Sequence, residues 1–325
     1  SAYYRHAVLV TSNGSLMGAG ENSEGQISSS LIKERIMQFT EFTINDKNGV
    51  KLNPLSAVCS RYGTLYMFAK SSGIGRQLVY CDQEINGGDP VFLDIGNNQP
   101  VAIFGGYSNT AAITSEGDVI FINRHVVKKS PESTITAVSL PEGEKATSVA
   151  CCEDFVFVLS SNSKVFSSVI ERGSNLIRLS ADKELEGKEI VCLSGTYKHC
   201  LAVTKEGIVF GRGPNSCGQL GIGNETKRLT VFTEISSLNG QEIKAAYAGL
   251  YHSLFETGGG KIFACGYNDY GQLLLNTGLN EGNVYSPTET MISGDSLFCI
   301  AGGFLSVIFI GGDPPQNTPN MRFIF

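Results

Sequence analysis

The stretch His199-Cys-Leu-Ala-Val-Thr-Lys-Glu-Gly207-Ile-Val-Phe210 decides the fold. An alternating apolar strand runs into a glycine turn, and a second apolar strand begins immediately after it. Alternation with a period of two is typical of a half-buried strand, and two such runs around a glycine predict a β-hairpin. Gly207 suits this turn because glycine adopts positive φ without steric cost.

The same frame recurs along the chain, with a glycine eight residues after its first position. The further clear copies run from His6 to Gly14, from Asn109 to Gly117 and from His252 to Gly260. Weaker copies occupy residues 155–163 and 305–313, and a degenerate copy begins near Tyr62. The seven starting positions, or anchors, are separated by 44 to 56 residues, enough for four short strands. The repeat therefore predicts an all-β fold, a seven-bladed β-propeller of four-stranded antiparallel blades.

A short apolar strand that ends in small residues precedes most anchors, as in Ile190 to Gly195. We expect it to be the inner strand of each blade. Only five residues precede His6, so the first unit is predicted to lack this strand. We expect Met321 to Phe325 to pair with the first unit and to close residues 1–325 into one ring. The interval from Ile27 to Ala57 is expected to form an extended excursion from the first blade that is suited to binding a partner, with a strand where Ile36 to Ile44 alternates.

A second motif, G-x-N-x-x-G-Q, follows the hairpin in three of the units. It occurs as Gly20-Glu-Asn22-Ser-Glu-Gly25-Gln26, Gly213-Pro-Asn215-Ser-Cys-Gly218-Gln219 and Gly266-Tyr-Asn268-Asp-Tyr-Gly271-Gln272. Three histidines, His6, His199 and His252, share the anchor position. A residue that recurs at one position of a repeat is more often structural than catalytic, so we expect these imidazoles to hydrogen-bond a neighbouring blade. The glycines and glutamines of the loops and the turn glycines are likewise assigned structural roles.

These hairpins and loops resemble the repeat of the regulator of chromosome condensation family, a seven-bladed propeller. The best match is Ala248-Gly249-Leu-Tyr-His252-Ser253, followed by Gly260 to Leu273. The resemblance implies a protein-interaction propeller or, in the chromatin-bound branch, a guanine nucleotide exchange factor for the GTPase Ran. In that branch acidic residues before the hairpin histidine matter for exchange. Here only Asp154 keeps a carboxylate next to an anchor.

Composition excludes several classes of function. The net charge is −6 and no basic run exceeds the pair Lys128-Lys129, so strong binding to DNA is not expected. The sequence contains no Trp, on which the W-D repeat and the ultraviolet photoreceptor of the resembling family depend. The nine cysteines include no C-x-x-C and the four histidines are scattered, so we expect no metal and no cofactor.

No apolar run is long enough for a membrane helix and the start does not resemble a signal peptide, so we expect an intracellular monomer, cytoplasmic or nuclear, without membrane insertion. The residues just before each anchor should open together on one face, because the repeat fixes their height in each blade. We therefore predict a partner-binding face made by Tyr107, Asp154, Lys198 and Tyr251, with His199 and His252 deeper. Mixed aromatic and charged residues suit a protein partner, among which a small GTPase is one candidate. A propeller enzyme or lectin with a site at the axis remains a remote alternative.

Overall fold

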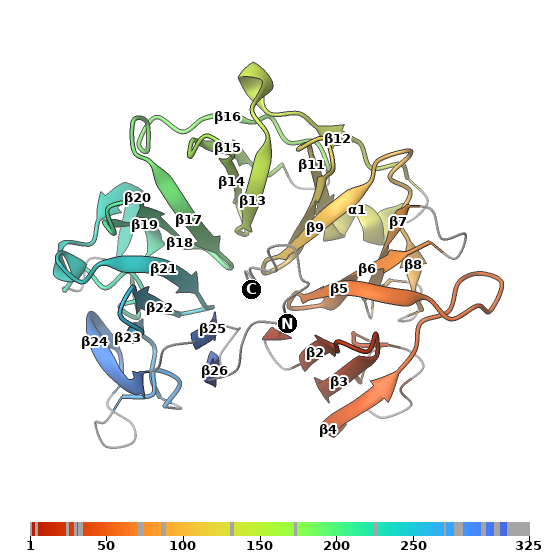
Figure 1. The fold of residues 1–325 in the computed structure, drawn as a ribbon, viewed down its shortest axis with the longest axis horizontal. Coiled ribbons are helices and arrows are strands. Elements are labelled where there is room, and N and C mark those ends of the chain that lie inside the picture. Colours follow the sequence, from red (N-terminus) through yellow and green to blue (C-terminus); the bar gives the residue numbers. More distant parts are fainter. Residues whose placement is uncertain are drawn as a thin grey trace.

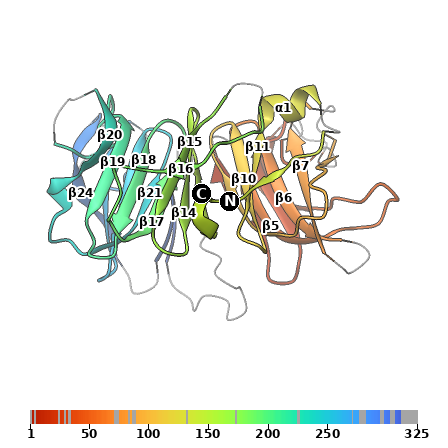
Figure 2. The same cartoon turned by 90° about the horizontal axis from the view of Figure 1, so that it is seen from above.

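Radial β-sheets surround a central axis in the computed structural model (Figure 1). It describes residues 2–310 apart from 4–5, 24–25, 29–30, 32–34, 71–74, 83, 86–88, 131–132, 172–173, 224–226, 270, 276–281, 294–296 and 302–305. Seen from the side, the strands run roughly along the axis of the ring (Figure 2). The predicted all-β propeller is thereby confirmed.

The first three blades are four-stranded antiparallel sheets whose strands follow chain order. The first contains β1 (Ala2–Tyr3), β2 (His6–Val10), β3 (Leu16–Glu21) and β4 (Arg35–Phe42). The second contains β5 (Asn53–Cys59), β6 (Gly63–Ala69), β7 (Arg76–Asp82) and β8 (Val91–Phe92). The third contains β9 (Pro100–Gly105), β10 (Asn109–Thr114), β11 (Val119–Asn123) and β12 (Ala137–Val138), with the helix α1 (Arg124–Lys129) between its last two strands.

Three more four-stranded sheets follow, and a shorter one completes the series in the described part of the chain. The fourth blade contains β13 (Ala146–Cys151), β14 (Phe155–Ser160), β15 (Val165–Val169) and β16 (Ser180–Ala181), preceded by the 3-10 turn η2 (Pro141–Gly143). The fifth contains β17 (Ile190–Gly195), β18 (Cys200–Thr204), β19 (Val209–Pro214) and β20 (Arg228–Glu234), followed by η3 (Ser236–Leu238). The sixth contains β21 (Ile243–Ala248), β22 (His252–Thr257), β23 (Lys261–Gly266) and β24 (Val284–Ser293). The seventh sheet pairs β25 (Leu297–Ala301) with β26 (Ser306–Ile310).

Apolar side chains fill the spaces between neighbouring blades. Tyr66 and Phe68 are fully buried between the first and second blades, Phe121 is buried between the third and fourth, and Phe157 between the fourth and fifth. Burying one such side chain contributes roughly 1.5 to 3 kcal/mol. Because each of these clusters needs residues from two adjacent blades, the blades stabilise one another.

The first blade differs from the sequence prediction at its inner edge. Its inner strand is present, because β1 pairs with β2 through Ala2 with Ala7 and Tyr3 with His6. Two residues are enough for this ladder, so the short segment before His6 suffices and the prediction is wrong. The ring closure expected from Met321 to Phe325 concerns residues outside the described part of the chain.

The interval from Ile27 to Ala57 is largely absorbed into the ring rather than forming a separate excursion. Its central part is β4, the outer strand of the first blade, and its end enters β5. A turn at Asp46 to Gly49, closed by an N–H···O bond of 3.0 Å, joins them.

The degenerate second copy of the repeat begins one residue later than the sequence predicts. Gly63, not Tyr62, starts β6 and pairs with the end of β7 as the other anchors do.

Candidate protein-binding face

In the second to sixth blades, the connections between the first and second strand meet on one face of the ring. Each connection ends at the anchor of its hairpin, and the hairpin turn lies at the opposite end of the second strand. The turn glycines Gly14, Gly117, Gly207 and Gly260 all have positive φ, from 79° to 87°. The two ends of each second strand therefore belong to opposite faces of the molecule.

Two of the three anchor histidines connect consecutive blades beneath this face. His6 Nε2 lies 3.2 Å from Thr64 Oγ1, and His199 Nε2 lies 3.0 Å from Ser253 Oγ. In both cases the partner belongs to the next blade. The Thr64 hydroxyl donates to the Gln26 carbonyl at 2.9 Å, and the Ser253 hydroxyl donates to the Gln219 carbonyl at 2.6 Å. In both cases one hydroxyl of the following blade is hydrogen-bonded to the histidine side chain and to the glutamine carbonyl of the preceding blade.

The asparagine of the G-x-N-x-x-G-Q loop folds the loop on itself. Oδ1 of Asn215 accepts from the Leu220 N–H at 2.8 Å, and Oδ1 of Asn268 accepts from the Leu273 N–H at 3.0 Å. Gly218 and Gly271 have φ of 84° and 71°, which favours glycine. The corresponding Gly25 lies outside the described residues, whereas Gln26, Gln219 and Gln272 are buried. In the fifth blade the loop and the histidine are linked to each other through Ser253 of the sixth blade.

Five tyrosines form a cluster at the axial end of this face, here called the axial tyrosine cluster. It consists of Tyr62, Tyr107, Tyr197, Tyr251 and Tyr267. The rings of Tyr107 and Tyr197 are 4.3 Å apart between centroids, and those of Tyr197 and Tyr251 are 5.8 Å apart. Tyr107 is only 7% exposed, while Tyr197 and Tyr251 are half-buried. The aromatic rings therefore pack over the axis and leave some of their surface open to a partner.

Backbone hydrogen bonds hold the cluster. The Tyr107 N–H donates to the Thr196 carbonyl at 3.3 Å, and the Arg61 N–H donates to the Tyr107 carbonyl at 2.9 Å. These two bonds join the second, third and fifth blades. Because neighbouring side chains are locked by packing, the cluster is a pre-formed surface, which reduces the ordering cost of binding.

Cations surround the aromatic rings. The Arg61 guanidinium lies 4.9 Å from the Tyr107 ring centroid, and the Arg124 guanidinium lies 4.0 Å from that of Tyr62. Arg124 is buried and makes a two-point ion pair with Asp82. Lys198 Nζ lies 3.2 Å from Glu153 Oε2, and this carboxylate raises the pKa of the lysine. Arg124 and Lys198 are therefore paired with carboxylates, and Arg61 lies directly against the aromatic rings.

The structure brings three of the four predicted partner-binding residues together. Tyr107 and Tyr251 both contact Tyr197, and Lys198 Nζ lies 5.0 Å from the centroid of that ring. Asp154 is exposed on the fourth blade and makes none of these ring contacts, although the N–H of its neighbour Glu153 donates to the Tyr197 carbonyl at 2.6 Å. The Asp154 carboxylate has no hydrogen-bond or ion-pair partner among the residues the structure describes.

Sequence reasoning missed Tyr197, which is the centre of the cluster. Tyr197 stands two residues before its anchor, as Tyr107 does, and this equivalence is the signal that identifies it.

His199 and His252 lie beneath the face, each 1% exposed, and burial lowers their pKa values to about 3 and about 4. They are neutral hydrogen-bonding groups at neutral pH.

Other kinds of site find little support in the described residues. Within them, no three His, Cys, Asp or Glu side chains are grouped as a bound metal ion would require. None of the helices in this part of the chain has the length and apolar character needed to span a bilayer.

Comparison with known proteins gives related sequences and folds. The family described as "Regulator of chromosome condensation (RCC1) repeat" matches residues 1–26 and 243–272. The chain is 39% identical over 105 residues to the probable E3 ubiquitin-protein ligase HERC4 of Homo sapiens, covering 32% of this chain and 10% of the ligase. The matched segment is thus about a tenth of that relative's length.

Solved structures extend the likeness to nearly the whole chain. Human WBSCR16 superposes with a TM-score of 0.76 at 16% identity, over 96% of this chain and 86% of the other. Prp20p of Saccharomyces cerevisiae superposes with a TM-score of 0.70 at 14% identity, over 93% and 79%. At these identities the likeness shows the fold.

Proposed function

We propose that this chain, a divergent member of the regulator of chromosome condensation repeat family, is a protein-interaction propeller that binds its partner with the face of the axial tyrosine cluster. Tyrosines are enriched at protein interfaces because each offers a large apolar ring and a hydrogen-bonding tip at low entropic cost. The single observation that carries the proposal is the packing of the half-buried Tyr197 and Tyr251 rings against each other and against the buried Tyr107 ring. Prp20p, whose fold is similar, was described together with its binding properties to Gsp1p and histones.

Site-specific photo-cross-linking in cells tests the face whatever the identity of the partner. A cross-linking amino acid replaces Asp154, at one end of β14, or Ser161, at the other end of the same strand. Both positions are exposed, and they lie on opposite faces of one blade. We expect a discrete protein adduct from position 154 and none from position 161. An adduct only from position 161 would contradict the proposal.

Nucleotide exchange on a small GTPase is the second candidate function. The unpartnered, exposed carboxylate of Asp154 favours it, because the family resemblance places acidic residues important for exchange next to the hairpin anchor. Exchange requires no covalent chemistry, only a surface that opens the nucleotide site of the GTPase.

Release of a fluorescent guanine nucleotide from a panel of Ran-, Rab- and Rho-type GTPases tests this candidate. Accelerated release from one member, reduced by Asp154→Ala, would support exchange activity. Binding of a GTPase without accelerated release would leave the chain an interaction module alone.

A further inference from the structure

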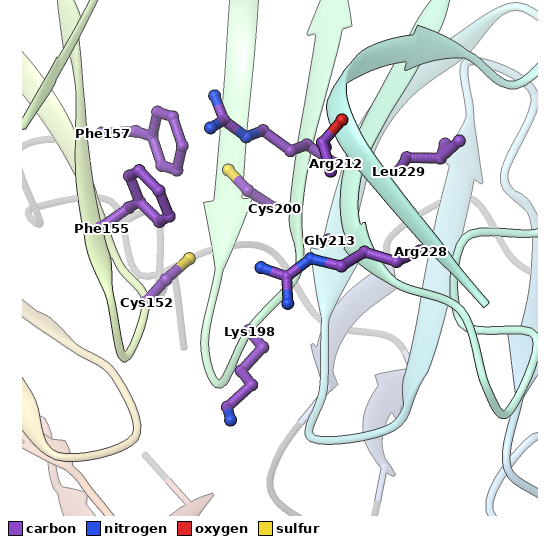
Figure 3. Close-up of a pocket in the computed structure, with 10 residues that line it drawn as sticks. Cys152, Phe155, Phe157, Lys198, Cys200, Arg212, Gly213, Arg228 and Leu229 are labelled. Carbon is purple, nitrogen blue, oxygen red and sulfur yellow. The ribbon is translucent and has the colours of Figure 1, made fainter. Parts of the chain in front are cut away.

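A pocket opens between the fourth and fifth blades on the same face as the axial tyrosine cluster. Its volume is about 200 Å³, and its lining includes Cys152, Phe155, Phe157, Cys200, Arg212 and Arg228 (Figure 3). Ligand and cofactor pockets are usually larger, roughly 300 to 1,000 Å³. This volume is therefore suited to one side chain of a bound protein rather than to a whole cofactor.

Arg212 is held in place at the pocket wall. Its guanidinium lies 4.7 Å from the ring centroid of Phe155 and 5.7 Å from that of Phe157. Its Nη1 lies 3.5 Å from Glu184 Oε2, which also accepts from the Phe232 N–H at 2.6 Å. A guanidinium fixed by stacked rings loses little freedom when it binds an anion, which is the condition for pre-organised recognition.

Arg228 supplies an unpaired charge. It is the first residue of β20, is exposed, and has no side-chain hydrogen bond or ion pair within the described chain. Figure 3 shows its guanidinium extended toward Cys152 and the backbone at Gly213. The third cation of the lining, Lys198, is already paired with Glu153.

The lining itself contains no carboxylate among the described residues. The carboxylates of Glu184 and Glu153 offset Arg212 and Lys198 from outside the pocket, and the buried Asp182 adds a third carboxylate beside the Cys200 thiol. Arg228 is the cation of the lining that no carboxylate contacts within the described chain. Burial raises the pKa of the Cys200 thiol, which is therefore neutral and does not oppose an incoming anion. A side-chain carboxylate carries one negative charge, whereas a phosphoryl group carries nearly two at neutral pH.

We propose that this pocket binds the carboxylate of an Asp or Glu side chain from an acidic segment of a protein partner. The proposal rests on the proposed function, because it assigns a specific contact to the same face. Arg228 approaches the carboxylate as a free guanidinium and Arg212 from a fixed wall, and charge-assisted hydrogen bonds of this kind are roughly twice as strong as neutral ones. The two phenylalanines contact the aliphatic part of the same side chain.

Fluorescence polarisation with the whole chain tests the pocket with three labelled peptides. The first is Gly-Ser-Glu-Glu-Glu-Ser-Gly, the second has Gln in place of each Glu, and the third has phosphoserine in place of the central Glu. We expect the Glu peptide to bind about tenfold more tightly than the Gln peptide, the value of one charge-assisted contact. Arg228→Gln should remove that preference and Arg228→Lys should restore part of it. Lys205→Gln, an equal loss of charge at an exposed site on the opposite face, should leave it unchanged.

Three results would overturn the proposal that the pocket binds a carboxylate. They are equal binding of the Glu and Gln peptides, an unchanged preference in Arg228→Gln, and tenfold tighter binding of the phosphoserine peptide than of the Glu peptide. The cross-linking at position 154 keeps this failure separate from that of the proposed function. An adduct at position 154 together with equal binding of the Glu and Gln peptides would reject the carboxylate pocket but still support the protein-binding face.

Discussion

The imidazole of His199 and the hydroxyl of Ser253 meet 3.0 Å apart across the boundary between the fifth and sixth blades. Ser253 is fully buried and donates onward to the Gln219 carbonyl at 2.6 Å. His6 and Thr64 repeat the arrangement between the first and second blades. His6 and His199 therefore connect neighbouring blades, and the partner of each is a hydroxyl one residue beyond the next anchor.

A double-mutant cycle measures this connection. His199→Ala and Ser253→Ala should each lower the free energy of unfolding by about 1 to 3 kcal/mol, because each leaves a buried polar group unpaired. The double variant should lose less than the sum of the two, as expected for residues that share one hydrogen bond. Urea unfolding followed by circular dichroism gives the values. Strictly additive losses would show that the two side chains do not interact.

Removing the buried side chain of His252 should lower the melting temperature more than removing the exposed carboxylate of Asp154. His252→Ala leaves a cavity beneath the face and should lower the melting temperature by several degrees, as expected for a loss of about 1 to 2 kcal/mol. Asp154→Ala should leave it within about one degree, since exposed substitutions usually change stability by less than about 0.5 kcal/mol. Calorimetry compares the two. An equal loss in both variants would make Asp154 a structural residue.

The buried histidines predict a pH dependence of stability. Burial lowers the pKa values of His199 and His252 to about 3 and about 4, whereas an unfolded histidine titrates near 6.5. The unfolded state therefore binds more protons between these values, and stability is retained above pH 6.5 and falls as the pH drops toward 4. Each histidine contributes a slope of at most about 1.4 kcal/mol per pH unit. His199→Gln should make the measured slope shallower, and an unchanged slope would contradict the assignment.

The first glycine of the G-x-N-x-x-G-Q loop should be intolerant of any side chain. Gly213 has a φ of 122°, and a Cβ atom there would collide with the Lys198 carbonyl and the His199 backbone. We expect Gly213→Ala to cost about 3 kcal/mol or more. Gly14 also has positive φ, at 79°, but no atom lies within 4 Å of its Cβ position. Gly14→Ala is the matched control and should cost only about 1 kcal/mol. Equal costs would show that the close approach does not matter.

Much of the ring can be predicted because the determinants of each blade are local. The alternating strand, the turn glycine and the G-x-N-x-x-G-Q loop all lie within about 25 residues of one another. Where the local signal is weak, the prediction fails. Tyr62 resembles an anchor because it is the first aromatic residue before the apolar run, whereas Gly63 occupies that position and only glycine fits against the Cys81 carbonyl.

The site is harder to predict because its contacts join distant blades. Tyr107 and Tyr251 are 144 positions apart and meet through Tyr197, which no pattern within one blade reveals. The carboxylate pocket depends on the same kind of contact. Arg212 and Arg228 belong to ordinary strand positions, and only the packing of the fifth blade against Phe155 and Phe157 turns them into one wall.

The most direct test of the central claim is to measure how tightly the cross-linked partner binds two variants of the chain that carry matched charge reversals. Asp154→Lys changes the face of the axial tyrosine cluster, and Glu206→Lys makes the same change at an exposed turn on the opposite face. Isothermal titration should show a loss of about tenfold or more for Asp154→Lys, because a reversed charge at an interface opposes a complementary surface. Glu206→Lys should bind as the unchanged chain does. An unchanged affinity for Asp154→Lys together with a loss for Glu206→Lys would place the partner on the opposite face and contradict the account.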